Sequence, residues 1–327
     1  MKSFIYKIRK GLWPKLAILC YHRIGDYKSD PVKITVSNEN FLKQIEYIKN
    51  FAEIIHPDQL FDSLNNRKNL PKRSILLTFD DGYSSYKQTM NILFDKSISA
   101  IFFLSSRKEK FWWDILSKIL FENESINNND YQTITSLLFN LGYEFEIEKH
   151  IKSDSMNSLS KWDVTNNYFP FNRNKAFYLI ANKMENIDNY NNEMFKMVSS
   201  LSKNERNFNY LSDRKLIDYH RIGYHTTNHL NLSKLDFDSQ RKEIELGKKE
   251  FESFINKQIN IFAYPFGTRN HYNEDTLKIV KSNFSFAFSN FHGLVHKDSN
   301  IFELPRFLIR DWPIDEFKHR VKSFFNK

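Results

Sequence analysis

Short apolar runs alternate with segments of helical apolar spacing over most of the chain. A run at residues 16–20, for example, is followed at 37–51 by apolar residues three or four apart. The expected strands are 16–20, 53–56, 74–79, 100–104, 221–224, 259–264, 284–288 and 302–309. The expected helices are 37–51, 57–66, 83–96, about 211–220, 235–255, 274–281 and 314–325. One strand followed by one helix is typical of a parallel sheet or barrel, whose sites lie where the strands end.

This alternation is interrupted between residues 107 and 212. Residues 112–121 have the spacing of a helix, whereas 123–130 are rich in asparagine and 186–192 are polar. A segment of this length is too long for a plain connection, so we expect a mainly helical insertion at about 107–212. It would form either a lid over a site or an inert addition.

Composition favours one folded domain. A chain of 327 residues fits one α/β barrel with additions or two modest domains. The hydrophobic fraction of 41% excludes wholesale disorder. Because we find no internal repeat and no linker rich in proline or glycine, we expect a single domain over 1–327. Cys20 is the only cysteine, which excludes an internal disulfide and is compatible with a reducing compartment.

The net charge of +9 indicates an anionic neighbourhood, such as a membrane surface, a nucleic acid or a charged polymer. The basic residues are dispersed and form no arginine-rich tract, so we expect no nucleic-acid partner. Residues 1–15 mix basic and apolar side chains, which fits either a solvated leader or a short amphipathic helix on an anionic membrane. No apolar run suits a signal peptide or a membrane span, which favours a cytoplasmic protein, with any membrane contact at the inner face.

Two adjacent carboxylates end the apolar run at 74–79. Side chains alternate between the two faces of a strand, so Asp80 and Asp81 point apart unless the chain turns, which Gly82 permits. One acid could then bind a metal while the other handles a proton. The alternative is that either aspartate only caps the helix expected from Tyr83.

A pair of histidines follows another expected strand. His225 and His229 are four residues apart, which brings both imidazoles to one face if the chain turns helically. A hydrolytic metal site needs three protein ligands and one open position for water. Asp81, His225 and His229 supply that number.

Three motifs resemble the polysaccharide deacetylase family, which is carbohydrate esterase family 4 or the NodB-homology domain. They are T-F-D-D-G at 78–82, H-T-T-N-H at 225–229 and F-A-Y-P-F-G at 262–267. The resemblance covers about two-thirds of the chain. Y-H-R-I at 21–24 and L-P-R at 304–306 also resemble the branch that contains the biofilm poly-N-acetylglucosamine deacetylases, whose substrate is an exopolysaccharide.

The resemblance implies a distorted (β/α) barrel of about seven strands. It also implies a hydrolase that cleaves amide bonds and removes acetyl groups from an N-acetylated polysaccharide or glycan precursor. By the family pattern, Asp81, His225 and His229 bind one divalent metal ion, usually zinc, and Asp80 is the general base. A backbone N–H near Phe266 would hold the oxyanion.

Two family features are absent here. In the family the third motif usually begins with an arginine that supports the general base, and here Phe262 or Ala263 occupies that place. Arg306 either substitutes for this arginine from a neighbouring strand or is a surface arginine. No L-x-H motif follows Leu304. In the biofilm branch the acid-bearing strand comes first, which would make His22 the general acid.

A histidine suits that role because its pKa lies near 6.5, and a nearby carboxylate would raise its protonated fraction. His292 and His296 are the alternative acids. The residues expected to contact substrate are Tyr264, Phe266 and Arg306. Trp112 and Trp113 fit either a sugar platform or packing.

Two other functions share these features. An O-acetyl sugar esterase would use every one of the same residues. A catalytically silent carbohydrate-binding protein of the same fold would have no need of Asp80 beside the metal ligands, so the intact aspartate argues against it. The motifs do not name the sugar.

Overall fold

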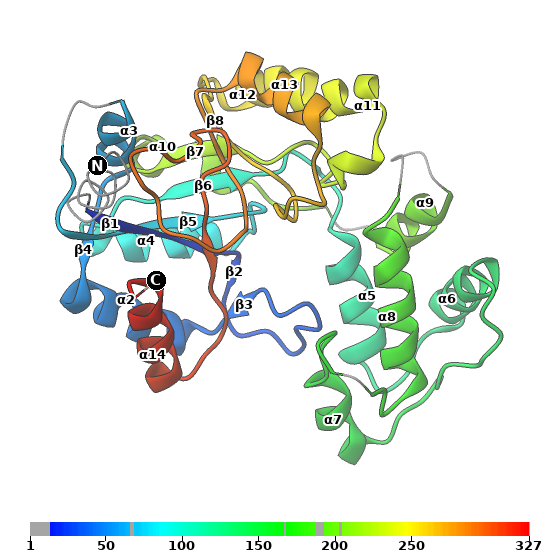
Figure 1. The fold of residues 1–327 in the computed structure, drawn as a ribbon. Helices are drawn as coiled ribbons and strands as arrows, with labels where there is room; N and C mark the ends of the chain where they lie inside the picture. Colours follow the sequence, from blue (N-terminus) through cyan, green and yellow to red (C-terminus); the bar gives the residue numbers. More distant parts are fainter. Residues whose placement is uncertain (1–13, 66–68, 167, 188–192, 203–204, 327) are drawn as a thin grey trace, which may run out of the picture.

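The strands and helices of a computed structural model follow the apolar pattern closely (Figure 1). The model describes residues 14–65, 69–166, 168–187, 193–202 and 205–326. The strands are β1 (Lys15–Tyr21), β2 (Arg23–Ile24), β3 (Thr35–Val36), β4 (Glu53–Ile54), β5 (Arg73–Phe79), β6 (Ile101–Leu104), β7 (Arg221–Tyr224), β8 (Ile261–Ala263), β9 (Phe286–Phe288) and β10 (Phe307–Leu308). The helices around them are α2 (Asn38–Phe51), α3 (Pro57–Leu64), α4 (Tyr86–Asp95), α10 (Arg214–Tyr219), α11 (Phe237–Arg241), α12 (Gly247–Ile255), α13 (Glu274–Asn283) and α14 (Ile314–Phe324).

One curled parallel sheet forms the centre of the fold. Its seven-strand path runs β10-β1-β5-β6-β7-β8-β9, and β4 pairs with the first half of β5. The two ends of the path approach each other, because Leu304, just before β10, forms a parallel bridge with Phe288 of β9. This architecture confirms the expected distorted barrel of about seven strands. The strand expected at 302–309 is shorter, because only that bridge and β10 pair there.

The two faces of the sheet have different partners. Alternate residues of each strand, such as Leu77 and Phe102, pack outward against the helices in the larger apolar cluster. The others, such as Leu76 and Phe103, form a smaller cluster on the enclosed side. Phe103 of β6 lies 5.0 Å from Phe288 of β9, centroid to centroid, although two strands separate them in the sheet. The sheet must therefore curl around this smaller cluster.

Two helices differ from the prediction near the motifs. The helix expected from Tyr83 begins at Tyr86, after a turn in which the N–H of Tyr86 donates to the carbonyl of Tyr83 at 3.0 Å. The helix expected at 235–255 is divided into α11, a π-helical turn at Lys242–Leu246, and α12. Such turns often occur at functional sites.

The described part of residues 107–212, called the insertion below, forms a helical lobe beside the carboxyl ends of the strands (Figure 1). Its helices are α5 (Trp112–Phe121), α6 (Asn128–Asn140), α7 (Met156–Ser160), α8 (Asn172–Met184) and α9 (Glu193–Ser200). Arg173 is fully buried and donates to four main-chain carbonyls within this lobe. The loop between β2 and β3 contacts it through a Lys33–Asp163 ion pair of 2.9 Å.

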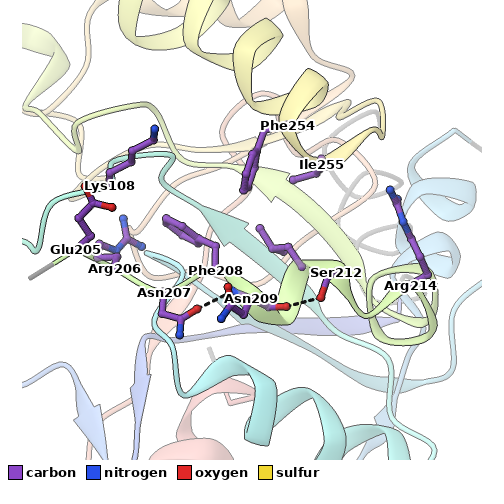
Figure 2. A pocket seen from close by; sticks show the side chains of 11 residues that line it. Lys108, Glu205, Arg206, Asn207, Phe208, Asn209, Ser212, Arg214, Phe254 and Ile255 are labelled. Atoms are coloured by element: carbon purple, nitrogen blue, oxygen red, sulfur yellow. Dashed lines mark hydrogen bonds between the residues drawn. The ribbon is translucent and has the colours of Figure 1, made fainter.

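A hollow of about 610 Å³ separates residues 205–214 from the end of α12 (Figure 2). A second cavity, described below, lies between the sheet and the insertion. No helix in the described part of the chain is long and apolar enough to cross a bilayer. The predicted membrane contact of residues 1–15 falls almost entirely on residues 1–13, which lie outside the described residues.

Candidate metal centre and active site

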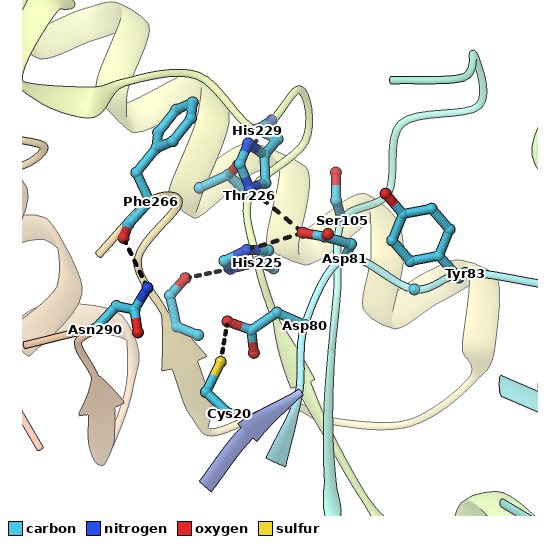
Figure 3. A network of polar contacts seen from close by, with 12 residues as sticks. Cys20, Asp80, Asp81, Tyr83, Ser105, His225, Thr226, His229, Phe266 and Asn290 are labelled. Atoms are coloured by element: carbon cyan, nitrogen blue, oxygen red, sulfur yellow. Dashed lines mark hydrogen bonds and ion pairs between the residues drawn. The ribbon is translucent and has the colours of Figure 1, made fainter. Parts of the chain in front are cut away.

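The residues of the motifs meet at the carboxyl ends of the strands. Asp80 follows β5 directly and continues the sheet, since its N–H donates to the carbonyl of Tyr21 at 2.9 Å. By the alternation of the strand, Asp80 shares a face with Leu76, which belongs to the enclosed cluster. Cys20 comes from the same side of β1, and its Sγ lies 3.5 Å from Asp80 Oδ2 (Figure 3).

Asp80 is held by a fully buried arginine. Arg306 Nη1 donates to Asp80 Oδ1 at 2.7 Å and Nη2 to Oδ2 at 2.6 Å, while Nε donates to the carbonyl of Ser289 at 2.7 Å. Burial raises the pKa of Asp80, but the Arg306 guanidinium and nearby His225 outweigh it and hold that pKa below its usual range. Arg306 is 0% exposed, so the alternative of a surface arginine is excluded.

Asp81 leaves the strand in a different direction. Its φ of 82° and the φ of 87° at Gly82 form a turn that reverses the alternation of the strand. Its Oδ1 lies 3.5 Å from His225 Nε2 and 3.4 Å from His229 Nε2 (Figure 3). The prediction that Gly82 permits the turn is incomplete, because Asp81 also adopts a positive φ in this turn.

The two histidines are oriented by main-chain groups. His225 Nδ1 lies 2.8 Å from the carbonyl of Ala263 and can donate to it, which directs Nε2 toward Asp81. Thr226, at φ 62°, accepts the main-chain N–H of His229 through its hydroxyl at 3.1 Å. His229 has a φ of 55°. Such strained residues persist where the surroundings determine them and cluster at functional sites.

The π-helical turn holds the loop between the histidines. There the carbonyl of Glu243 accepts the N–H of Thr227 at 3.3 Å and the hydroxyl of Tyr224 at 3.1 Å. Its buried carboxylate accepts two bonds from Asn228, at 2.7 and 2.6 Å. Gly247 leaves room for this contact, because a Cβ there would lie 2.0 Å from Thr227 Oγ1.

The donor atoms of Asp81, His225 and His229 fit a divalent metal ion. They lie within 4.8 Å of one another, all three residues are buried, and Asp81 Oδ1 has no hydrogen-bond partner among the residues that the structure describes. Tetrahedral ligands about 2.1 Å from a zinc ion lie about 3.4 Å apart, which agrees with the two measured separations. Although burial raises the pKa of Asp81, the two imidazoles hold it well below its usual range, as a ligand carboxylate requires.

A second group of possible ligands, Cys20, His22 and Asp80, also lies within 4.8 Å. Both oxygens of Asp80 already accept from the Arg306 cation, which would repel a metal ion. Burial also raises the pKa of the Cys20 thiol well above its usual range, which disfavours the thiolate. This group is therefore a poor metal site.

A cavity of about 310 Å³ opens onto the metal centre. Its volume lies at the lower end of the range for small-molecule sites. The sheet and its loops line one side of the cavity through His22, Val32, Ile34, Asp81, His229, Phe266, His271, Asn290 and Leu308. The insertion lines the other side through Trp112, Trp113, Val164, Ala181, Asn182 and Glu185. A hydrogen bond of 2.9 Å between His271 Nε2 and the Glu185 carboxylate joins the two sides. The insertion thus forms one wall of the cavity.

The other residues expected at the site are placed as follows. His22 and Phe266 line the cavity. Tyr264 does not; it is 1% exposed and its hydroxyl donates to the carbonyl of Phe302 at 2.8 Å. His292 and His296, the alternative acids, lie between β9 and β10 and do not line the cavity.

The protonation of His22 differs from the expectation. Burial lowers the pKa of His22 below its ordinary value, although the nearby carboxylates of Asp81 and Asp80 raise it. The two carboxylates thus act in the expected direction, but desolvation, which the sequence does not reveal, outweighs them and sets the net direction of the pKa shift.

Several residues at the site carry no sequence motif. Trp113 and Phe111, which lie outside the three motifs, pack against His229 at 5.1 and 5.6 Å between centroids, on the same ring as Phe266 of the third motif at 4.9 Å. Trp113 Nε1 also donates to the hydroxyl of Tyr83 at 2.9 Å. Glu243 stands in a helix whose spacing predicts only an amphipathic face, and nothing in that pattern marks its role.

The chain belongs to the polysaccharide deacetylase family, whose model matches residues 67–155 and 174–283. A comparison with curated proteins found no match. The matched ranges contain Asp80, Asp81, His225 and His229.

Several solved structures have a similar fold. Streptococcus pyogenes deacetylase PplD, in complex with acetate, matches with a TM-score of 0.52 and 17% identity, over 94% of this chain and 97% of that chain. BC0361, a polysaccharide deacetylase from Bacillus cereus, matches with a TM-score of 0.51 and 16% identity over 94% and 69%. IcaB from Ammonifex degensii matches with a TM-score of 0.50 and 18% identity over 95% and 97%. At these identities the likeness shows the fold alone.

The metal centre predicts a selective loss of bound metal. His225→Ala and His229→Ala should each bind much less zinc than the parent protein when all are loaded with zinc in the same way, because two ligands remain of three. Asp80→Asn and His292→Ala should retain it. Elemental analysis of the folded variants would measure the metal content. If both ligand variants held as much zinc as the parent protein, the centre would lie elsewhere.

Proposed function

We propose that this chain is a metal-dependent carbohydrate deacetylase that hydrolyses the acetamido group of an N-acetylated sugar. The observation that carries the proposal is the arrangement of two adjacent carboxylates with separate partners. Asp81 faces two imidazoles across a gap of 3.4–3.5 Å, and Asp80 is locked to Arg306. A sugar-binding protein would need neither arrangement.

Asp81, His225 and His229 would hold one divalent ion, with zinc as the expected metal. An ion bound there supplies Lewis acidity, which activates a water molecule and polarises the acetyl carbonyl. The aromatic rings of Phe111, Trp113 and Phe266 exclude bulk water from one side of His229, which strengthens electrostatic interactions at the site.

Asp80 is the proposed general base, which accepts a proton from the attacking water. The two hydrogen bonds from Arg306 fix the plane of its carboxylate, so its reactive lone pairs have one orientation. Asp80 and His225 are buried and do not line the cavity, so water reaches Asp80 past Asp81 and His22. In this proposal Arg306 and Tyr264 position the site and do not contact substrate.

The remaining roles concern charge on the reacting group. The main-chain N–H of Phe266, at a residue with φ 57°, is proposed to donate to the oxyanion. His22 lines the same cavity and has a ring nitrogen within 4.8 Å of an Asp80 oxygen. We assign it to deliver a proton to the departing amine, because an amine leaves poorly unless it is protonated.

The cavity wall supplied by the insertion supports a role in substrate choice. Trp112, Asn182 and Glu185 line it opposite the metal centre. A space of about 310 Å³ suits one sugar with its acetamido group better than a long stretch of polymer. The substrate would therefore enter with a single residue, either at a chain end or on a branch.

The Asp80→Asn variant tests this function most directly. The parent protein with zinc should release acetate from an N-acetylglucosamine oligosaccharide, and Asp80→Asn should lose nearly all of this activity while it retains the metal. Acetate release would be measured on both. Parental activity in the variant would contradict the role of Asp80, and release from O-acetylated sugars alone would make the protein an esterase.

His22→Ala tests the general acid. The variant should keep its zinc and lose roughly 10²–10⁴ in the rate of amide hydrolysis, the range for one acid–base group. An aryl acetate ester should be affected less, because its leaving group needs little protonation. The comparison uses kcat for both substrates, with His296→Ala as the control. Equal rates for parent and His22→Ala on both substrates would return the role to His292 or His296.

The role of the insertion predicts a dependence on substrate size. Trp112→Ala should raise KM for an acetylated oligosaccharide more than for a small aryl acetate, because only the larger substrate reaches the insertion wall. Phe139→Ala, at a 67% exposed position on α6, is the matched control and should change neither constant. Equal effects of Trp112→Ala on KM for both substrates would indicate that Trp112 packs within the protein and does not contact the substrate.

A further inference from the structure

Arg206, from the end of the insertion, joins the ends of two neighbouring strands. Its Nη1 donates to the carbonyls of Ser105 at 3.2 Å and Arg107 at 3.0 Å, in the segment after β6. Its Nη2 donates to the carbonyls of Asp81 and Gly82, the second at 2.9 Å, in the turn after β5. One side chain thus makes four main-chain contacts beside the metal centre.

The turn at Asp81 is the part of the site that most needs such support. Asp81 has a φ of 82°, a conformation that is unfavourable for a residue with a side chain and persists only where neighbours enforce it. Its carbonyl also accepts the N–H of Ser105 at 3.3 Å. At Gly82 a Cβ would lie 3.1 Å from Arg206 Nη2, so the glycine leaves space for the guanidinium.

Aromatic rings fix the guanidinium from its faces. The Arg206 Cζ lies 4.3 Å from the centroid of Phe111 and 4.8 Å from that of Phe208, within the range of cation–π contacts. Phe111 in turn packs against His229. Arg206 therefore contacts the main chain of one proposed ligand and the aromatic neighbour of another.

We propose that Arg206 is a positioning residue that holds the Asp81 turn in the orientation that binds metal. The insertion would then have a second role besides lining the cavity, because its Arg206 would hold one of the metal ligands in place. The inference rests on the proposed metal site and adds to it a requirement that the three ligands alone do not imply.

The hollow in Figure 2 offers a route to test the contact chemically. Arg206 lines it together with Lys108 and Phe208, and its volume is about 610 Å³. In Arg206→Ala the space left by the guanidinium would adjoin this hollow. A free guanidinium ion could then enter and donate to the same carbonyls, at concentrations far below those that unfold proteins.

The experiment measures zinc affinity on metal-free protein by competition with a chromophoric chelator. Arg206→Ala should bind zinc roughly 10–100-fold more weakly, the usual effect of removing a group that orients a ligand. Arg206→Lys should also weaken binding, because an ammonium cannot bridge four carbonyls. Guanidinium ion should return the affinity of Arg206→Ala toward that of the parent, and urea should not.

Arg173→Ala is the matched control. Arg173 is also an arginine of the insertion that donates to four main-chain carbonyls, of Glu148, Leu120, Asn123 and Glu124, none of which lines the catalytic cavity. Its loss should lower the thermal stability and leave the zinc affinity unchanged.

Three results would overturn the inference. They are parental zinc affinity in folded Arg206→Ala, an equal loss of affinity in Arg173→Ala, and no effect of guanidinium ion. If Arg206→Ala does not fold, the zinc affinity of Arg206→Lys is measured in its place, and parental affinity in that variant would contradict the proposal. A parent protein that bound no zinc would overturn the metal centre itself, whereas a parent that bound zinc without deacetylase activity would overturn only the proposed reaction.

Discussion

The site depends on the constraint that two adjacent aspartates must face different partners. Asp80 keeps the alternation of β5 and meets Arg306 on the enclosed side of the sheet, and Asp81 reverses the alternation through a positive φ. Both carboxylates are almost fully buried, so each needs a cationic or metal partner. Removing Arg306 would leave Asp80 buried and unpaired, a change that typically costs about 3–5 kcal/mol. The surrounding elements hold the two carboxylates in these different orientations.

The support comes from segments that are far apart in the sequence. Arg306 approaches from the strand that closes the barrel, Glu243 from a π-helical turn, and Arg206 from the insertion. Each donates to or accepts from a group at the end of a central strand. The barrel thus supplies the strand ends, and later parts of the chain fix how the side chains leave them.

Apolar periodicity predicted most of the elements. Burial between sheet and helices makes apolar residues recur every second residue along a strand and about every three and a half residues along a helix. This periodicity also placed Asp80, Asp81, His225 and His229 at strand ends. It did not predict the φ of Asp81, the π-helical turn at Glu243 or the role of Arg206, because these follow from contacts between distant segments. The sequence indicated that nearby carboxylates raise the pKa of His22, but it did not reveal the larger, opposing effect of burial, which depends on the packing around the ring.

X-ray absorption at the zinc edge of the purified, zinc-loaded protein tests the central claim most directly. Asp81, His225 and His229 predict two imidazole nitrogens with oxygen ligands at about 2.0–2.2 Å and no sulfur. A spectrum with that ligand set would support the metal centre on which the proposed reaction depends. A sulfur ligand at about 2.3 Å, which only a cysteine or methionine can supply, or a spectrum without imidazole, would contradict it.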